Sequence, residues 1–170
     1  MIRFFSSLVV LFIATKAYTQ QYNFINYSIE DGLVQSQIQS ICQDNDGYIW
    51  IGTLGGLSKF DGINFENYST DNGLLNNQID AVYNDKKGRI WLGTQGGVSV
   101  YNGHSFDNFK FKKELSENFV LSITEDISGN IWFATDGGGI VYLKDTTFNY
   151  INLPNGSDNN YVRHIYADLK

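Results

Sequence analysis

The residues of this 170-residue chain with the most obvious chemical potential are carboxylates in a short turn. The run Asp44-Asn45-Asp46-Gly47 has the form of the opening of a calcium loop. A calcium loop continues with more oxygen ligands and a distal glutamate, whereas here the chain enters the apolar run Tyr48-Ile49-Trp50. In the equivalent turn, 41 residues later, Lys86-Lys87 stands between the aspartate and the glycine. We therefore interpret the run as a turn with Asp first and Gly fourth, and we expect no metal site there.

Histidines and serines offer no better pattern for catalysis. His104 and His164 lie in different parts of different repeats, and neither has a second metal ligand at a suitable spacing. Ser36, Ser40 and Ser122 have no histidine base in register with them, so a nucleophilic triad is not predicted.

Repeated acids and glycines are explained by folding. Asp44, Asp85 and Asp126 recur at matching turns, which places them in separate structural units and not in one acid–base pair. The pairs Gly55-Gly56 and Gly96-Gly97 connect strand to strand, whereas a phosphate-binding loop opens a helix. The sequence therefore predicts no catalytic residue, no metal site and no cofactor.

The elements that carry these residues repeat with a fixed period. Trp50, Trp91 and Trp132 are each 41 residues apart, and each follows an Asp-x-x-Gly turn. A period near 40 with this internal identity is typical of an array of like units. In the third unit Gly137-Gly138-Gly139 has one glycine more than the earlier pairs, so later positions shift by one.

Each unit divides into four short runs separated by turn residues, which predicts hairpin-linked strands. In the first unit the runs are about 37–42, 48–53, 57–60 and 64–69. The run Ile49-Trp50-Ile51 is apolar on both faces, as in a sheet packed between two other sheets. We therefore predict an all-β fold, a β-propeller of four-stranded blades.

Small residues recur where propeller blades converge. Ser40, Ala81 and Ser122 lie in the first strand of each unit, which is nearest the axis of a propeller. Gly52, Gly93 and Ala134 recur in the second strand, where they would allow close approach of the backbones.

The expected domain organisation is a leader followed by part of a ring. Residues 1–19 have a positive start, an apolar run and small residues at the end, which predicts a signal peptide; an uncleaved anchor is the alternative. Residues 20–170 then form a partial propeller. We expect a closure strand at 22–28, blades at about 36–69, 77–110 and 118–152, and the start of a next blade at 160–170. Three blades cannot close a ring of typically 4–8, so we expect a longer protein.

Charge and cysteine content exclude some classes of function. Without the leader the chain has 10 basic and 18 acidic residues, because Arg3 and Lys16 are removed from the 12 basic residues of the full chain. An acidic chain without a basic cluster is a poor nucleic-acid binder. Cys42 is the only cysteine and lies in an apolar strand, so we expect a small buried side chain and no internal disulfide.

The motif Asp-x-x-Gly-x-Ile-Trp-Ile-Gly-Thr-x-Gly-Gly-Leu, with Phe-Asp-Gly at 60–62, resembles the two-component regulator propeller repeat. The resemblance covers about 22–168, although the third unit has Ala134 for glycine and Lys144-Asp145 where Asp61-Gly62 stands. It implies one or two periplasmic propellers, followed by a tyrosine-rich sandwich domain, a membrane helix and a histidine kinase. By this resemblance the chain is the start of an extracytoplasmic sensor, and kinase activity cannot be assigned to its residues.

Candidate ligand-facing residues lie in the loops that do not repeat. Leu54, Gln95 and Asp136 occupy one position in the loop after the second strand and differ from one another. The loops after the fourth strand, on the same propeller face, include Asn76, Asn77 and the stretch 112–118. Variation on a fixed frame is where recognition usually lies.

The leading hypothesis is a ligand-sensing propeller segment of a two-component signalling protein, exported to the periplasmic or extracellular side of a bacterial membrane. It would not be catalytic in itself, and would bind an unknown small-molecule, glycan or peptide ligand. Its other partners would be the remaining blades and the downstream signalling domains, with a membrane contact only through a downstream span. The alternative is a secreted or surface-exposed protein- or glycan-binding scaffold. A propeller-type enzyme, such as a polysaccharide lyase or hydrolase, is disfavoured because no acid–base pair or metal cluster converges.

Overall fold

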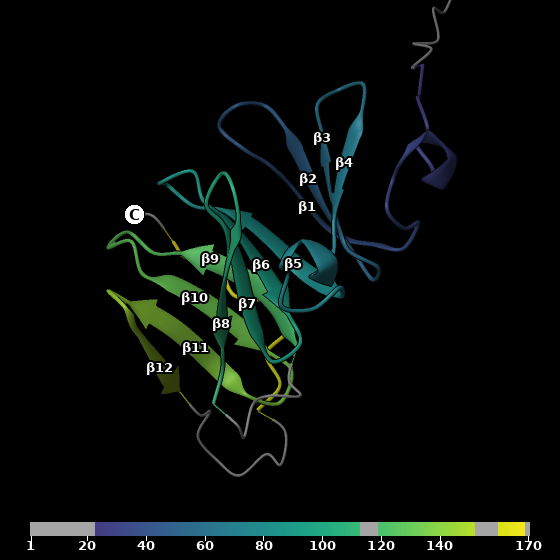
Figure 1. The fold of residues 1–170 in the computed structure, drawn as a ribbon. Coiled ribbons are helices and arrows are strands. Elements are labelled where there is room, and N and C mark those ends of the chain that lie inside the picture. The colour runs from purple at the N-terminus through teal and green to yellow at the C-terminus, as the bar shows by residue number, and fades with distance from the viewer. Residues whose placement is uncertain (1–22, 113–118, 152–159, 169–170) are drawn as a thin grey trace, which may run out of the picture.

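The computed structural model describes residues 23–112, 119–151 and 160–168, and their strands form three four-stranded antiparallel sheets (Figure 1). Each sheet is a meander in which strands consecutive in sequence pair. The strands of the first sheet are β1 (Ile38–Gln43), β2 (Ile49–Thr53), β3 (Leu57–Phe60) and β4 (Phe65–Tyr68). Those of the second sheet are β5 (Ile79–Asn84), β6 (Ile90–Thr94), β7 (Gly97–Tyr101) and β8 (Phe106–Lys110). Those of the third sheet are β9 (Val120–Glu125), β10 (Ile131–Thr135), β11 (Gly139–Lys144) and β12 (Thr147–Ile151).

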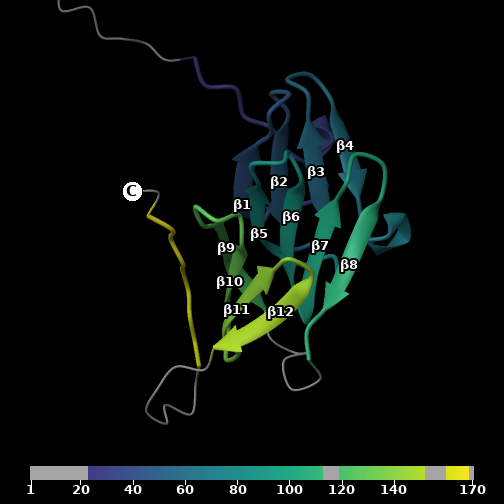
Figure 2. The ribbon, with the colours of Figure 1, turned by 90° about the vertical axis from the view of Figure 1, so that its left-hand side faces the viewer.

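The sheets are arranged as successive blades of a propeller. The first strands β1, β5 and β9 of neighbouring sheets contact each other, whereas the fourth strands lie at the outer edge (Figures 1 and 2). The described sheets form an open arc and not a closed ring. The predicted fold class, all-β with four-stranded propeller blades, is confirmed.

Two short 3₁₀ turns lead into the first two blades. They are η1 (Ile29–Asp31) and η2 (Thr70–Asn72), each with a serine N-cap and a glycine C-cap in the left-handed conformation. The segment before η1, for which a closure strand is predicted, forms no strand over 23–28. The sheet that such a strand would complete is not among the described sheets, so the closure strand remains a prediction. In the structure Tyr27 instead packs on Phe60 and Phe65, with ring centroids 4.8 and 5.7 Å away.

The core lies between the blades. The second strand of the middle blade, β6, is buried along its whole length. Trp91 is 1% exposed, and it lies in a cluster that joins the second and third blades. A Cβ atom added at Gly52 would lie 2.8 Å from the Ile79 and Val82 side chains of the next blade. The second strand therefore has room only for a small residue here, as the sequence predicts.

The repeated aspartate turns are held by their own carboxylates. Asp44 Oδ1 accepts hydrogen bonds from the backbone amides of Asp46 and Tyr48, at 3.0 and 2.9 Å. Its Oδ2 accepts the indole N–H of Trp50 at 2.7 Å. The same indole bond recurs from Trp91 to Asp85 and from Trp132 to Asp126, at 2.8 Å each. The turn interpretation is therefore confirmed, and the indole bond is an addition that the sequence alone did not indicate.

A second repeated network fixes the entry into the first two blades. In the second blade, Ser99 Oγ accepts the amide N–H of Leu75 at 3.0 Å and donates to Asn108 Oδ1 at 2.6 Å. Asn108 Nδ2 in turn donates to the Gly73 carbonyl at 2.8 Å. The same three bonds link Ser58 and Asn67 to the entry of the first blade. In the third blade the paired positions hold Val141 and Tyr150, and Phe111, 6% exposed, packs beside them.

The Cys42 thiol is half-buried and less enclosed than expected. Burial raises its pKa to about 12, and the nearby Asp44 carboxylate acts in the same direction. The thiol is therefore protonated near neutral pH, which is the opposite of what a reactive cysteine requires.

Acid is expected to weaken the third blade through Asp126. Burial acts to raise the pKa of this carboxyl, but hydrogen bonds, chiefly from the Asn130 and Trp132 side chains, lower it to about 2. Because the folded pKa lies below the ordinary value of about 3.9, the stabilisation is complete above that value and is lost as pH falls toward about 2. The urea concentration at the unfolding midpoint should therefore decrease between about pH 4 and about pH 2. In Asp126→Asn this decrease should be smaller. Asn130→Ala, which removes one donor, should move the fall to higher pH; an unchanged profile in both variants would contradict the assignment.

Candidate functional site

The loop after the second strand of a blade lies beside the segment that leads into a first strand. The Leu54 amide donates to the Gln37 carbonyl at 3.3 Å, and the Asp136 amide donates to the Phe119 carbonyl at 2.9 Å. Gln95 of the second blade also forms an isolated antiparallel bridge with Phe119 of the third. The two kinds of loop selected from the sequence therefore lie together at one end of the blades.

A row of polar side chains runs along this end of the second blade. Asn76 Nδ2 donates to Gln95 Oε1 at 3.4 Å, while Asn76 Oδ1 accepts the Gln78 amide at 2.9 Å. Gln78 Nε2 then donates to both carboxylate oxygens of Asp80, at 3.2 and 3.1 Å. All four side chains are half-buried. We call these residues, Gln95, Asn76, Gln78 and Asp80, the polar row.

The charge of the polar row resides on Asp80. Burial raises the pKa of its carboxyl, and the hydrogen bond from Gln78 opposes that rise. Asp80 occupies a repeat position that holds Gln39 in the first blade and Leu121 in the third. Amides and a carboxylate in one row can both donate to and accept from hydroxyl or amide groups of a ligand.

The other predicted residues have different surroundings. Asn77 Oδ1 accepts the amide N–H of Thr70 at 2.7 Å, so this side chain stabilises η2. Leu54 and Asp136 are half-buried in their own loops. Of the stretch 112–118, only Lys112 is described; its Nζ lies 4.1 Å from the centre of the Tyr150 ring, and residues 113–118 lie outside the described residues.

Sequence reasoning selected Asn76 and Gln95 but missed Gln78 and Asp80. Asp80 meets the same criterion that selected Gln95, since its repeat position varies from blade to blade. The sequence prediction does not include it because the first strand is expected to pack near the propeller axis.

The prediction that no histidine lies in register with a serine is wrong for Ser122. Its Oγ lies 3.2 Å from His164 Nδ1, because the segment around His164 and Ile165 lies beside Ser122 of strand β9. Ser122 Oγ also accepts the amide of Ile165 at 3.3 Å and is only 7% exposed. Ser40 Oγ accepts the Val82 amide of the next blade in the same way, at 3.0 Å. The serine hydroxyls therefore join neighbouring blades, and the histidine adds to one such joint.

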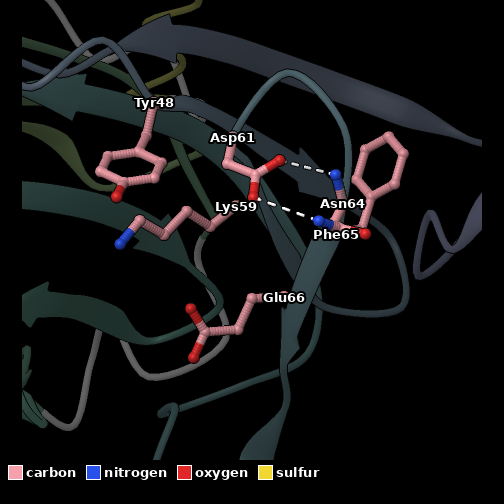
Figure 3. Close-up of a pocket in the computed structure, with 6 residues that line it drawn as sticks. All are labelled: Tyr48, Lys59, Asp61, Asn64, Phe65 and Glu66. Carbon is pink, nitrogen blue, oxygen red and sulfur yellow. Dashed lines mark hydrogen bonds between the residues drawn. The ribbon is translucent and has the colours of Figure 1, made fainter.

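A cavity of about 210 Å³ lies at the outer edge of the first blade, and none of the residues that line it belongs to the polar row (Figure 3). Lys59 Nζ lies 4.0 Å from the centre of the Tyr48 ring. The exposed Asp61 carboxylate accepts the amides of Asn64 and Ile63, at 2.6 and 2.7 Å, and these bonds lower its pKa. The Asp61 carboxylate thus stabilises the turn between β3 and β4, and we assign no ligand to this cavity.

The described part of the chain shows neither a metal-binding cluster nor a membrane-spanning helix. No group of three or more His, Cys, Asp or Glu side chains in 23–112, 119–151 and 160–168 could hold a metal ion. No helix in this part of the chain is long and apolar enough to cross a membrane. The predicted signal peptide, 1–19, lies outside the described residues.

Comparison with family models identifies the repeat. The model described as "Two component regulator propeller" matches residues 32–55, 73–96 and 114–137, one match in each blade. A relative, histidine kinase P4 of Formosa agariphila, is 42% identical over 60 residues, which are 34% of this chain and 4% of the kinase.

Several solved structures share the fold. The extracellular domain of a hybrid two-component system from B. thetaiotaomicron is 27% identical, with a TM-score of 0.64 over 75% of this chain and 18% of that one. The extracellular domain of a second system from B. thetaiotaomicron is 24% identical, with a TM-score of 0.68 over 81% of this chain and 20% of that one. An inactive variant of virginiamycin B lyase from Staphylococcus aureus, at 18% identity and a TM-score of 0.60, covers 77% of this chain and 45% of that one and shares the fold alone. The chain thus spans about a fifth of the length of these two extracellular domains.

Proposed function

Since the chain carries repeats of the two-component regulator propeller family, we propose that it is part of an extracytoplasmic sensor. Its ligand would bind at the end of the blades that carries the polar row. The chain itself is then non-catalytic, and its binding free energy is passed to signalling domains elsewhere in the protein. The observation that supports this proposal best is the polar row, in which Asn76 and Gln95 come from different loops and meet at 3.4 Å.

The polar row suits a ligand with many hydroxyl or amide groups. Gln95, Asn76 and Gln78 supply amide donors and acceptors, and Asp80 supplies a carboxylate acceptor. Side chains that are half-buried and already bonded to each other lose little freedom when a ligand binds. A glycan, a peptide or a polar small molecule offers the complementary groups.

Coupling to an output requires two states of the protein with different affinities for the ligand. Neighbouring blades are separate sheets joined by side-chain hydrogen bonds, which include the Ser40–Val82 bond, its Ser122–Ile165 counterpart and the Asn84–Gln43 bond. A ligand that spans two blades would therefore favour one relative position of the blades. We propose that this shift is what reaches the signalling domains.

Removing side chains of the polar row should weaken binding without unfolding the blade. Gln95→Ala and Asp80→Asn are each expected to lower affinity about ten-fold, equivalent to about 1.4 kcal/mol and in the range of one lost hydrogen bond. The probe is a panel of neutral oligosaccharides and short peptides, screened by thermal shift on the protein that contains this chain and then measured by calorimetry. The same variants should shift the concentration dependence of kinase autophosphorylation.

The control is Asn64→Ala, at the outer turn between β3 and β4, which should bind normally. Asn77→Ala and Asp136→Ala test two further residues that the sequence selected. If a panel member binds the unaltered protein and its affinity is the same in Gln95→Ala, Asp80→Asn, Asn77→Ala and Asp136→Ala as in Asn64→Ala, the proposed site is wrong.

A further inference from the structure

The cleft between the second and third blades contains a cavity that the polar row does not explain. It has a volume of about 190 Å³ and lies at the outer edge of the blades. Its apolar walls are Trp91, Val100, Phe109 and Leu143. The rings of Trp91 and Phe109 are stacked with their centroids 6.3 Å apart, and Phe109 is 38% exposed.

The repeat shows what fills the equivalent space in the neighbouring cleft. By strand register Tyr101 of β7 pairs with Ile90 just as Leu143 of β11 pairs with Ile131, so these two residues occupy one repeat position. In the cleft between the first and second blades, the Tyr101 ring packs against Trp50 and Tyr68, with centroids 5.1 and 5.8 Å away. In the second cleft a leucine replaces that ring.

The hydroxyl of Tyr101 also has a defined partner. It donates to the Gly103 carbonyl at 2.8 Å. The residue at the position of Gly103 in the third blade is Asp145, which lines the cavity. Asp145 has φ of 54°, in the same left-handed region as Gly103 at 101°. The turn that would accept a phenol hydroxyl is therefore retained where the phenol ring is absent.

Acidic groups surround the mouth of the cavity. Asp107 and Asp145 line it, and the Asp107 carboxylate accepts Asn102 Nδ2 at 3.1 Å. The one cation of the lining, Arg89, is paired with Asp85 at 2.7 Å and lies over Trp91. The remaining cavity of the first cleft is larger, about 270 Å³, but its walls carry the charged groups of Asp44, Lys59 and Lys87.

We propose that the cleft between the second and third blades binds a phenol ring, in the place that Tyr101 occupies in the first cleft. The ring would lie between Phe109, Trp91 and Leu143, and its hydroxyl would donate to the Asp145 carbonyl or to the Asp107 carboxylate. Aromatic rings packed in this way gain stabilisation beyond the area that they bury. This site is separate from the polar row and does not depend on the proposed sensor function.

The test uses 4-methylphenol as the probe, with binding followed by ligand-observed NMR on the protein that contains this chain. We expect saturable binding that Leu143→Tyr abolishes, because the introduced ring fills the cavity. Leu143→Met, which keeps a flexible side chain of similar size, should bind as the unaltered protein does. Methoxybenzene, which cannot donate a hydrogen bond, should bind about five-fold more weakly, the effect of one net hydrogen bond.

A second variant is expected to gain binding, which loss of folding could not explain. Tyr101→Leu should open an equivalent space in the first cleft and add a second binding event. N-acetyltyrosinamide distinguishes the source of the ring: tighter binding than 4-methylphenol indicates a tyrosine of a partner protein, and weaker binding indicates a free phenol. Absence of saturable binding by both probes, or binding that persists in folded Leu143→Tyr, would overturn the proposal.

Discussion

Replacing Asp85 with alanine is expected to lower the free energy of unfolding by about 3–4 kcal/mol, because a buried carboxylate that accepts several hydrogen bonds is lost and its donors are left unsatisfied. The Asp85 side chain is 2% exposed and accepts four hydrogen bonds. They come from the Lys87 and Arg89 amides, from Arg89 Nε and from the Trp91 indole, at distances from 2.7 to 2.9 Å. Burial acts to raise the pKa of this carboxyl, but these donors lower it, so it is ionised at neutral pH. Alanine would leave a buried indole N–H without its acceptor and a cation without its partner.

The equivalent turn of the first blade provides the matched control. Asp44 accepts the Trp50 indole and two amides, but Tyr48 stands where Arg89 stands in the second blade, so no ion pair is lost. Asp44→Ala should therefore cost less, about 1–3 kcal/mol. Urea unfolding of the two variants, monitored by tryptophan fluorescence, gives the comparison. Equal losses would show that the arginine does not contribute, and no loss in Asp85→Ala would contradict the role given to the carboxylate.

The strands could be predicted from the sequence because their limits are set locally. The third run of the first unit was expected at 57–60, and β3 is Leu57–Phe60. Turn residues explain this accuracy: Gly47 closes the first turn with φ of 94°, which a residue with a side chain rarely adopts. The repeat then carried the same limits to the other blades.

Bonds between distant residues could not be predicted in the same way. Ser58 and Asn67 are nine residues apart, and the segment that they hold lies 24 to 35 residues before them. Their recurrence as Ser99 and Asn108 was visible in the sequence, but only the register of the strands shows that they face each other. Two polar positions that recur in two units and are both apolar or aromatic in the third indicate such a bonded pair, and this pattern can be recognised in the sequence.

The candidate site was predicted at the level of loops and not of side chains. The choice of loops after the second and fourth strands placed Asn76 and Gln95 together, because both loops lie at the same end of a blade. The continuation of the row to Asp80 depends on a β-bulge in β5, where the register shifts between Ile79 and Ala81. A bulge changes which side chains share a face, and hydrophobic alternation does not reveal it.

Introducing valine at Gly93 is expected to cost about 3 kcal/mol, at the upper end of the usual range for overpacking. A Cβ atom at this position would lie 2.6 Å from the Val120 carbonyl oxygen and 2.9 Å from its Cγ1. Val120 is fully buried in the first strand of the third blade, so neither the backbone nor the side chain can move aside without separating two blades.

The matched control for Gly93→Val is Ala134→Gly in the third blade. Ala134 occupies the same repeat position and is fully buried, so a methyl group is accommodated there. Its removal should cost only about 1 kcal/mol, the usual penalty for glycine in a strand. Urea midpoints, together with the rate of proteolysis between the second and third blades, measure both variants. Because the blades are held together by this close approach, a Gly93→Val protein with an unaltered midpoint would show that they are joined mainly by other contacts.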